Sequence, residues 1–468
     1  MSTKKTIVIV GGGITGLSAA YYLQKEIKAN DLPYEVKLVE ASNRLGGKIK
    51  TIRKNGFTIE QGPDSFLSRK KPAVKLAEEV GLGDQLIRNG TGQSYILVNN
   101  KLHKMPSGAF MGIPTQVRPF LFSGIFSLKG KFRAGFDFLL PKGKPVNDQS
   151  LGAFFRHRFG DELVENLIEP LLSGIYAGDI DDMSLMSTFP NFYNLEQEHR
   201  SLVKGLQKTM PKSKKSTGKK PGMFFSFADG LETLVEKVIE NLDDVSIHTG
   251  ASVDHIEKKE FGYHLLLSNG DVLKADAVIM ATPHHAIPKM FSKYEFLKTF
   301  NEMPATSVAN VALAFDESAI KKDIDGTGFV VSRNNDYRIT ACTWTHKKWP
   351  KTTPEGKALV RCYVGRPSDQ SVVDLSDEEI IDIVLTDLNK TMNITAKPEF
   401  SVVTRWKNAM PQYTVGHQER IANIRKEAST QLPGVFLTGC SFEGIGVPDC
   451  IEQGEKAVSD VLGFLKDS

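Results

Sequence analysis

Three glycines near the N-terminus have the spacing needed to hold a phosphate group. Gly11, Gly13 and Gly16 stand in TIVIVGGGITGLSAAYYL, residues 6–23. In a strand-to-helix turn, the first glycine permits a tight turn, the second lets the backbone approach a pyrophosphate, and the third allows close packing of helix on strand. The positive end of the helix dipole then favours the phosphates. We therefore expect a dinucleotide site, and the same turn includes Gly12, Ile14 and Thr15.

The elements that must position these glycines follow from the hydrophobic pattern. Residues 8–10 predict a buried strand, and residues 14–23 predict the helix that follows it. A second predicted strand, YEVKLVE, ends at Glu40, at about the distance where an acid can bind a ribose hydroxyl. A glycine-rich turn without a ligand is the alternative, and the strand, helix and terminal acid together disfavour it.

The residues after Glu40 distinguish between dinucleotides. ASNRLGGKIKT follows directly, so Ala41 and Arg44 precede a second glycine pair, Gly46 and Gly47. Two close-approach glycines and a guanidinium suit a long cofactor whose phosphate needs charge compensation. The extension is similar to the signature of FAD-binding flavoproteins of the amine oxidase type, and NAD dehydrogenases do not usually carry it. We therefore expect FAD.

Two later regions resemble further parts of this cofactor-binding fold. VSIHTGASVDHIE and GDVLKADAVIMATP are strand-like, and the resemblance places Val253 at the adenine and Ala281 beside the cofactor. PGVFLTGCSFEGIGVPDCIEQGEKAV predicts a strand, a glycine-rich turn and a helix that begins near Asp449. This second helix N-terminus suits an anion or the polar edge of a flavin. Its candidate contacts are Gly439, Gly446 and Val447.

Composition and charge exclude several classes of protein. The 468 residues suggest two or three domains, and no apolar run is long enough to span a membrane. TIVIV ends after five residues, so we expect neither a signal peptide nor a transmembrane helix. The four cysteines form no CxxC pair, which argues against a metal site or a disulfide framework and favours the cytoplasm. A net charge of +4 does not by itself indicate nucleic acid.

Four motifs resemble those of the protoporphyrinogen oxidases. They are EQGPDSF (60–66), PGMFFSFADGLETLVE (221–236), RWKNAMPQYTVGH (405–417) and GCSFEGIGVPDCI (439–451). The similarity is greatest to the soluble Gram-positive type, the coproporphyrinogen III oxidases, and it covers essentially the whole chain. It implies FAD-dependent oxidation of a porphyrinogen to the porphyrin in haem biosynthesis. Three two-electron hydride transfers to flavin are implied, with dioxygen as the acceptor and hydrogen peroxide as the product.

The resemblance also implies an α/β fold with an α+β substrate part. We expect a Rossmann-like FAD-binding domain of the amine oxidase/p-hydroxybenzoate hydroxylase type, a mixed-sheet substrate domain and a helical domain. The FAD-binding domain is expected to be discontinuous, formed by residues 1–70, 222–285 and 405–468. The substrate domain is expected from residues 71–90 and 286–404, and the helical domain from residues 91–221.

Several site residues are implied by the same match. Gly62 and Pro63 are expected beside the isoalloxazine, and Asp64 at the edge of the substrate cavity, where plant-type relatives have asparagine. Asp64 is a candidate acceptor for a pyrrole N–H, and a simple turn contact is the alternative. Lys71 is a candidate partner for a substrate carboxylate, and Arg69 and Lys70 are rival candidates for the same role. The alternative for each of the three is a solvated surface side chain without a ligand.

The substrate itself is not decided by these motifs. Plant enzymes place an arginine, thought to hold a propionate, before an aromatic residue that Tyr95 matches, and here that position is Ser94. The carboxylate anchors are therefore expected to be rearranged. Coproporphyrinogen III is favoured and protoporphyrinogen IX is the alternative. Trp406 flanks the flavin or packs in the core, while His284, His285 and His417 are expected to be structural.

Two segments have two interpretations each. Residues 108–144 carry phenylalanines among arginines and lysines, as expected of a helical domain lining a cavity or of a peripheral contact with the inner face of the cell membrane. Residues 204–222 are rich in lysine and predict a flexible loop, with an anionic docking site as the alternative.

Two other functions share the expected fold. A flavin amine oxidase would need an aromatic cage at the flavin, and PQYTVGH and GVPDCI argue against it. A GDP dissociation inhibitor-like binding protein would lack a complete set of FAD-holding residues. The expected partners are a porphyrinogen and dioxygen, without nucleic acid or a resident metal. A downstream haem-pathway enzyme and a monomeric or homodimeric state stay open.

Overall fold

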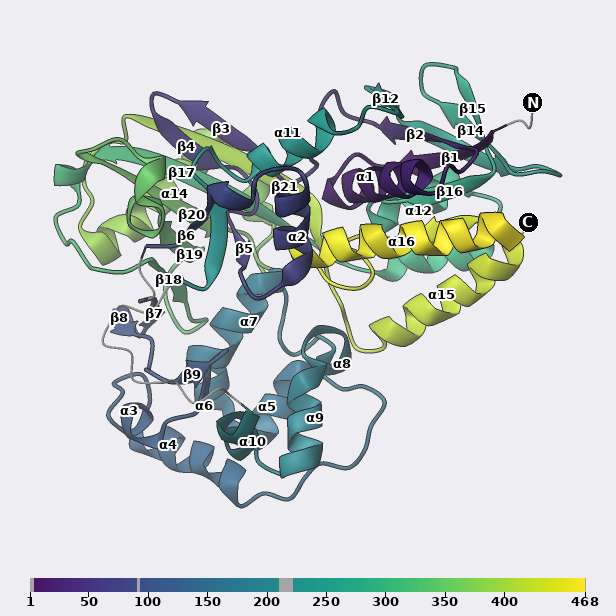
Figure 1. Cartoon of the computed structure of the whole chain (residues 1–468). Coiled ribbons are helices and arrows are strands. Elements are labelled where there is room, and N and C mark those ends of the chain that lie inside the picture. Colours follow the sequence, from purple (N-terminus) through teal and green to yellow (C-terminus); the bar gives the residue numbers. More distant parts are fainter. Residues whose placement is uncertain (1–3, 91–92, 210–221, 468) are drawn as a thin grey trace. The chain divides into compact units, whose positions relative to one another are not determined.

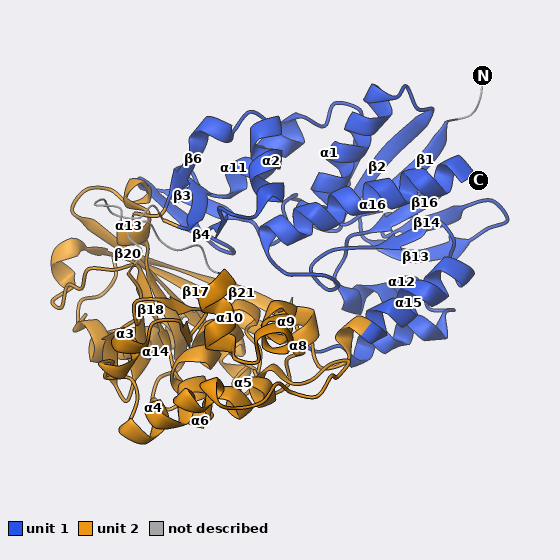
Figure 2. Ribbon diagram, turned by 60° about the horizontal axis from the view of Figure 1, so that its bottom comes forward, with its two compact units in different colours: residues 1–88, 223–304, 419–468 blue, residues 89–222, 305–418 orange. Residues whose placement is uncertain are grey.

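The structure is a computed structural model that describes residues 4–90, 93–209 and 222–467. The chain divides into two compact units (Figure 2), whose helices and strands are labelled in Figure 1. Unit 1 contains residues 1–88, 223–304 and 419–468, and unit 2 contains residues 89–222 and 305–418. The division into FAD-binding, substrate and helical domains stays a prediction.

Unit 1 is built on a five-stranded parallel sheet in the order β12-β2-β1-β16-β22. Its strands are β1 (Lys5–Val10), β2 (Tyr34–Glu40), β12 (Val245–Thr249), β16 (Ala277–Met280) and β22 (Val435–Leu437). In the central strand, Val8 is opposite Lys37 on one side and Val278 on the other. Ile7 and Ile9 pack into one hydrophobic cluster and Val8 and Val10 into another, so this strand is apolar on both faces, as parallel strands usually are.

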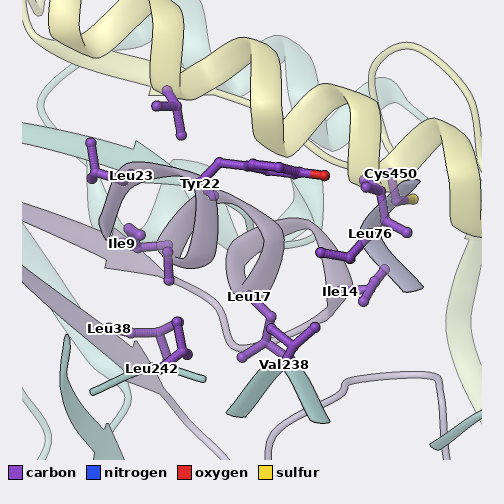
Figure 3. Packing of buried hydrophobic residues seen from close by; sticks show 14 of the residues in the cluster. Ile9, Ile14, Leu17, Tyr22, Leu23, Leu38, Leu76, Val238, Leu242 and Cys450 are labelled. Atoms are coloured by element: carbon purple, nitrogen blue, oxygen red, sulfur yellow. The ribbon is translucent and has the colours of Figure 1, made fainter. Parts of the chain in front are cut away.

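Helices cover this sheet and form most of its core. They are α1 (Ile14–Ala29), α2 (Lys71–Glu79), α11 (Glu232–Glu240), α12 (Ile287–Met290), most of α15 (His417–Gln431), and α16 (Val447–Asp467). Figure 3 shows Leu17 of α1 beside Val238 of α11, and Tyr22 facing α16. Helices α1 and α16 approach closely at Gly454, where a Cβ would lie 2.5 Å from the Thr15 carbonyl oxygen.

Unit 1 also carries three smaller β structures. The first sheet is β5 (Phe66–Leu67), β11 (Phe224–Phe227) and β6 (Leu86–Arg88). The second is β13 (Val253–Lys258), β14 (Tyr263–Leu267) and β15 (Val272–Ala275). The third is a ribbon of β3 (Thr51–Lys54) and β4 (Phe57–Glu60).

Unit 2 contains a seven-stranded sheet in the order β21-β17-β20-β19-β18-β7-β8. Its strands are β7 (Tyr95–Val98), β8 (Lys101–Lys104), β17 (Ala305–Asp316), β18 (Gly328–Val331), β19 (Ile339–Trp344), β20 (Lys357–Val364) and β21 (Phe400–Pro411). The pair β7–β18 is parallel, and the other neighbouring pairs are antiparallel. The sheet is therefore mixed, as predicted.

Helices and one short hairpin complete unit 2. The helices are α3 (Val117–Leu121), α4 (Leu128–Gly135), α5 (Leu151–Phe159), α6 (Asp161–Leu163), α7 (Glu169–Tyr176), α8 (Leu185–Thr188), α9 (Pro190–His199), α10 (Leu202–Thr209), α13 (Thr345–Lys348) and α14 (Asp377–Met392). The hairpin is β9 (Ala109–Phe110) and β10 (Ile113–Pro114). A π-helical turn (Val164–Ile168) precedes α7. Ser376 and Glu379 form a capping box at the start of α14.

Two sequence expectations can be compared with these elements. Residues 204–209 of the lysine-rich stretch belong to α10, so the predicted loop is wrong there, and residues 210–221 lie outside the described residues. The helix continues because Leu202, Val203 and Leu206 form a buried stripe. Among the described residues, no helix has the length and apolarity needed to cross a membrane.

Candidate functional site

The first glycine turn is shaped by close backbone contacts. Gly11 follows β1, has a φ of 108°, and donates its N–H to the Val39 carbonyl oxygen at 2.8 Å. A Cβ at Gly11 would lie 2.7 Å from the Ala281 carbonyl oxygen, and a Cβ at Gly16 would overlap the Gly11 carbonyl oxygen. Larger residues would therefore separate helix α1 from the sheet. The turn has the tight strand-to-helix geometry that the sequence predicted.

The N-terminus of α1 is open to an anion. Gly13 occupies the N-cap position and, as a glycine, provides no side chain to cap the first N–H groups of this helix. The described part of the chain also places no atom within 4 Å of a Cβ built on Gly13. Gly13, Ile14 and Thr15 thus present backbone N–H groups at a positive dipole end, which is the donor set that a pyrophosphate needs. The residues present fit the phosphate part of FAD.

Glu40 fixes the edge of this turn. One carboxylate oxygen accepts the Gly12 N–H at 2.7 Å, and the other accepts the N–H and the hydroxyl of Ser42, both at 2.8 Å. Each carboxylate oxygen has two lone pairs. Glu40 can therefore hold the loop and accept a ribose hydroxyl at the same time, and Ala41 follows it directly.

Arg44 organises the second glycine pair. Its guanidinium donates to the carbonyl oxygens of Gly47 and Ile49 at 2.8 and 2.6 Å, and it forms an ion pair with Glu232 at 2.7 Å. The Gly46 N–H donates to the Gly12 carbonyl oxygen at 2.8 Å, which joins the two glycine loops. Glu232 therefore partly compensates the charge of Arg44. The hydrogen bonds of Arg44 to the backbone fix the loop that carries the second glycine pair.

Three more predicted positions lie after strands or near the same sheet edge. The Ala281 N–H donates to the Val10 carbonyl oxygen at 2.8 Å, just after β16. Gly439 follows β22, and a Cβ built on it would lie 3.6 Å from the Thr15 hydroxyl oxygen. Val253 opens β13, close to Ala251, whose N–H donates to the Glu40 carbonyl oxygen at 3.2 Å. The carboxyl ends of parallel strands gather at one edge, where ligands of such sheets bind.

The second helix N-terminus differs in charge from the first. Helix α16 begins at Val447, two residues before the predicted Asp449, so the predicted boundary is corrected. Asp449 lies in its first turn and forms an ion pair with Lys70. A Cβ at Gly444 would lie 2.9 Å from the Asp449 Cβ, and the Asp449 carboxylate also lies beside Gly446. The acid offsets the positive dipole end, so this turn suits a neutral polar group better than a phosphate.

The segment predicted to run beside the flavin is held by backbone and hydroxyl groups. A Cβ at Gly62 would overlap the Lys48 carbonyl oxygen, so this position requires glycine, and Pro63 follows it. Asp64 is half-buried, and one of its carboxylate oxygens accepts the Ser65 hydroxyl at 2.6 Å. The Asp64 carbonyl oxygen accepts the Ser226 hydroxyl at 2.8 Å. The predicted turn contact of Asp64 is therefore present.

The predicted substrate contacts are divided between the two units. Arg69 and Lys71 are exposed in unit 1, and Lys71 is the first residue of α2. Tyr95 lies in the core of unit 2, where its hydroxyl donates to the Asp325 carbonyl oxygen at 2.8 Å and burial raises its pKa. Trp406 is also in unit 2, on β21 opposite Val308.

The histidines have structural surroundings. His284 is buried, with its ring nitrogens 2.9 Å from the Ser441 hydroxyl and 2.9 Å from the Met303 carbonyl oxygen. Burial lowers the pKa of His284 and of His285. His417 stacks on Tyr413 at 4.1 Å between ring centroids. These contacts match the structural roles expected for them.

Two residues at the site were missed by the sequence analysis. Glu232 forms an ion pair with Arg44, and its carboxylate also accepts a hydrogen bond from the Thr51 N–H at 2.7 Å. Lys48 follows the second glycine pair, and its ammonium lies 3.6 Å from the Cys440 sulfur. The position of Lys48 directly after Gly47 was an available signal, whereas the Glu232 contact joins residues far apart in the chain. Among the described residues, no group of three His, Cys, Asp or Glu side chains is arranged to hold a metal ion.

Comparison with known proteins identifies relatives along the whole chain. A family model described as flavin containing amine oxidoreductase matches residues 14–462. The coproporphyrinogen III oxidase of Bacillus subtilis (strain 168) is 56% identical over 99% of this chain and 99% of its own. That of Staphylococcus aureus (strain NCTC 8325 / PS 47) is 45% identical over 98% of this chain and 100% of its own. Protoporphyrinogen oxidase 1 of Spinacia oleracea is 29% identical over 98% of this chain and 84% of its own.

Solved structures share the fold. A crystal structure from Exiguobacterium sp. 255-15 superposes with a TM-score of 0.88 at 38% identity, and the match covers 100% of both chains. A putrescine oxidase structure superposes with a TM-score of 0.71 at 15% identity, over 98% of this chain and 99% of the other. The second likeness shows the fold alone.

Proposed function

Because the chain belongs to the family of flavin-containing amine oxidoreductases, we propose that it oxidises coproporphyrinogen III to the porphyrin in haem biosynthesis. The α/β flavoprotein fold, the family resemblance and the FAD cofactor predicted from sequence are confirmed. The observation that carries the choice of substrate is the high identity, over nearly the full length, to two bacterial coproporphyrinogen III oxidases. The lower identity to a plant protoporphyrinogen oxidase makes protoporphyrinogen IX the second candidate.

In this proposal, unit 1 holds the cofactor through its backbone. Gly13, Ile14 and Thr15 bind the pyrophosphate, Gly12 lines the turn beside it, and Glu40 binds the ribose. The remaining contacts are Gly11, Gly16, Ala41, Arg44, Gly46, Gly47, Gly62, Pro63, Val253, Ala281, Gly439, Gly446 and Val447, with Trp406 in unit 2. The open N-terminus of α1 and the one acceptor position left on the Glu40 carboxylate support these assignments.

The chain's own residues then orient the porphyrinogen. When bound, FAD would supply a hydride acceptor for the three two-electron oxidations, with dioxygen as the proposed final acceptor and hydrogen peroxide as the product. Asp64, fixed by Ser65, accepts a pyrrole N–H and so orients the ring. Arg69, in the exposed loop before α2, and Lys71, the exposed first residue of α2, bind propionates. Tyr95 contributes by packing, since its hydroxyl is engaged within unit 2.

Steady-state kinetics in air test the proposal. We expect the yellow protein to oxidise coproporphyrinogen III with three molecules of peroxide formed for each porphyrin, and with a higher kcat/KM than for protoporphyrinogen IX. Peroxide formation from primary amines, with none from either porphyrinogen, would instead identify an amine oxidase. A colourless protein that binds no flavin would point to the GDP dissociation inhibitor-like alternative.

We also infer a peripheral contact with anionic membrane lipids through residues 117–144. Phe122, Leu128, Phe132 and Leu139 expose between 73% and 85% of their surface. Exposed cations accompany them, namely Arg118, Lys129, Lys142 and Lys144. Asp137 is the one carboxylate of this segment, and it is buried against the Ser201 hydroxyl. Apolar side chains with cations but without exposed acids match the chemistry of an anionic bilayer surface.

Vesicle flotation tests this contact. We expect the protein to float with vesicles that contain anionic phosphatidylglycerol, and to float less in high salt or with purely zwitterionic vesicles. Phe122→Ser with Leu128→Ser should abolish flotation. Phe261→Ser is the matched control, because Phe261 is 85% exposed in unit 1. Unchanged flotation of the double variant would contradict the inference. The oligomeric state and a downstream partner enzyme stay predictions.

A further inference from the structure

A surface cavity of unit 2 lies beside the segment proposed to contact the membrane. It has a volume of about 310 Å³, and its lining includes residues 103–107, Pro119 and residues 122–124. Strand β8, which ends at Lys104, is the edge strand of the seven-stranded sheet, and Pro119 belongs to helix α3. The cavity is therefore formed within one unit, where the edge strand meets the exposed apolar segment.

Buried residues fix one wall of this cavity. Phe120 and Phe126 lie on either side of residues 122–124 in the chain, and both are buried with their ring centroids 5.1 Å apart. The Asn166 side-chain amide donates to the Ile125 carbonyl oxygen at 3.1 Å. A ligand would therefore meet a loop that is already ordered, which lowers the entropy cost of binding.

The polar side chains of the lining are one cation and several neutral groups. The cation is Lys104, which has no ion-pair partner among the described residues. Ser107, Ser123 and His103 line the same cavity, and burial lowers the pKa of His103, so its ring is neutral near pH 7. The Ser123 hydroxyl oxygen accepts the Ile125 N–H at 3.2 Å, so its O–H can donate to a ligand. This set suits a singly charged phosphate diester that carries hydroxyl groups.

No acidic residue lines the cavity. Residues 85–136 contain no aspartate or glutamate. Glu162 of α6 reaches this segment from outside, and its two carboxylate oxygens accept the N–H and the hydroxyl of Ser127, both at 2.6 Å. An anion in the cavity would therefore be attracted by Lys104 without a facing carboxylate to repel it.

Phe122 connects the cavity to the proposed membrane contact. Its side chain lines the cavity and is 82% exposed, and Val117 and Leu121 of the neighbouring helix α3 are half exposed. Apolar side chains of peripheral proteins insert at the boundary between lipid head groups and acyl chains. Insertion of Phe122 would bring the cavity to the level of the lipid phosphates.

We propose that this cavity binds the head group of an anionic phospholipid, with Lys104 pairing with the phosphate diester and Ser107 and Ser123 donating hydrogen bonds. This inference rests on the proposed membrane contact and adds a specific site to it. The preferred head group carries hydroxyls and no cation, because Lys104 repels the ammonium of a zwitterionic lipid. Lysines on an edge strand also discourage pairing with other chains, but a lysine with that role alone would not affect ligand binding.

Titration of the holoenzyme with soluble lipids tests the site. The probe is dihexanoyl phosphatidylglycerol below its critical micelle concentration. The readout is the NMR signal of the Met105 methyl group, which lines the cavity and is assigned through Met105→Leu. This signal should shift until the site is saturated. Lys104→Gln should raise the dissociation constant about tenfold, and Lys104→Arg should recover most of the affinity.

Lys129→Gln is the matched control, because Lys129 is exposed in the same segment but does not line the cavity. It should weaken binding to phosphatidylglycerol vesicles about fivefold through the loss of one surface charge. It should change the dissociation constant of the soluble lipid by less than about twofold. Dihexanoyl phosphatidylcholine should bind the unchanged protein about tenfold more weakly than the phosphatidylglycerol does.

Each outcome has a separate meaning. An unmoved Met105 signal, or equal losses in Lys104→Gln and Lys129→Gln with the soluble lipid, would overturn the site while flotation still supports the membrane contact. Inorganic phosphate that binds as tightly as the soluble lipid would overturn the lipid assignment in favour of a free anion. If the unchanged holoenzyme does not float with anionic vesicles, the membrane contact fails and this inference fails with it. Porphyrinogen oxidation is measured separately, so the proposed enzymatic function stands or falls independently. Loss of flavin in both Lys104 variants would assign Lys104 a structural role and overturn the proposal.

Discussion

The two units differ in the polar groups on which their structures depend. In unit 1, the predicted cofactor site is made from backbone N–H groups, glycine contacts and one acid, Glu40. In unit 2, the interior contains ionised side chains paired across the sequence, such as Arg158 with Glu196. Backbone sites depend on local geometry, whereas buried ion pairs depend on both partners being present. The two units should therefore respond differently to substitution and to pH.

The largest effect is expected from enlarging a glycine of unit 1. A side chain at Gly16 would overlap the Gly11 carbonyl oxygen and force helix α1 away from the sheet. Gly16→Val should therefore weaken FAD binding by more than about 100-fold, roughly 2.7 kcal/mol. Flavin absorbance of the purified protein measures this directly. Gly463→Ala is the control, because a Cβ there meets no described atom within 4 Å; retained flavin in Gly16→Val would refute the role of backbone contact.

The buried ion pair of unit 2 gives the next effect. Arg158 and Glu196 are buried, and the Arg158 Nε donates to a Glu196 oxygen at 2.9 Å. Glu196→Leu should lower the free energy of unfolding by about 3 kcal/mol, because it leaves the arginine charge buried with less compensation. Arg158→Met combined with Glu196→Leu should recover most of the loss. Denaturant titration measures both variants.

An exposed pair is the control for that comparison. Lys298 and Glu295 are more than half exposed, so Lys298→Gln should change the free energy of unfolding by less than about 0.5 kcal/mol. If Glu196→Leu were as mild as Lys298→Gln, the contrast between the two units would not hold.

Gly13 allows a substitution with two opposite effects. Its extended N-cap conformation, with φ −71° and ψ 176°, suits an aspartate that accepts the helix N–H groups. Gly13→Asp should stabilise the flavin-free protein by only about 0.3 kcal/mol, and it should weaken FAD binding about tenfold by placing an anion at the phosphate site. Gly13→Asn can cap the helix N–H groups without adding a charge, so it should reduce the affinity for FAD less than Gly13→Asp does. Tighter FAD binding by Gly13→Asp would contradict a phosphate at this N-terminus.

The smallest effects are two opposite dependences on pH. In unit 2, burial raises the pKa of Glu169 to about 7, against the opposing effect of Arg333. One Glu169 oxygen also has no hydrogen-bond partner among the described residues. The folded state therefore binds this proton up to higher pH than the unfolded state does, and the free energy of unfolding falls as pH rises toward 7. Glu169→Gln should remove this decrease.

In unit 1, the free energy of unfolding depends on pH in the opposite direction. Burial lowers the pKa of His284, with smaller contributions from His285 and Lys48. The unfolded state therefore binds this proton more readily, and the free energy of unfolding falls as pH drops below the ordinary histidine value of about 6.5. Compared with the unchanged protein, the free energy of unfolding of His284→Gln should rise as the pH is lowered. That of Glu169→Gln should rise, by the same comparison, as the pH is raised. Parallel trends in the two variants would contradict the assignment.

The features predicted from sequence are those that depend on local pattern. Strand β2 ends at Glu40 as predicted, and the glycine turn follows β1, because hydrophobic periodicity and glycine spacing are encoded within short segments. The helix after the second turn begins two residues earlier than expected. The loop predicted for residues 204–209 is helical, since tertiary burial of Leu206 outweighs a lysine-rich composition.

The features missed are pairs that only the fold brings together. Glu232 meets Arg44, and Arg88 meets Ser68, across strands and helices that a single sequence does not align. Long-range pairing depends on register and packing, which local propensity does not contain. The resemblance to a family supplied the cofactor and substrate class, while these two contacts came from the structure.

Anaerobic reduction of the bound flavin by coproporphyrinogen III tests the central proposal most directly. The holoenzyme, mixed without oxygen with this porphyrinogen, should lose its yellow absorbance and should recover it when air is admitted, with porphyrin fluorescence appearing. Protoporphyrinogen IX should bleach the flavin more slowly. A flavin that stays oxidised with both porphyrinogens, in a protein that retains FAD, would contradict the function proposed for this chain.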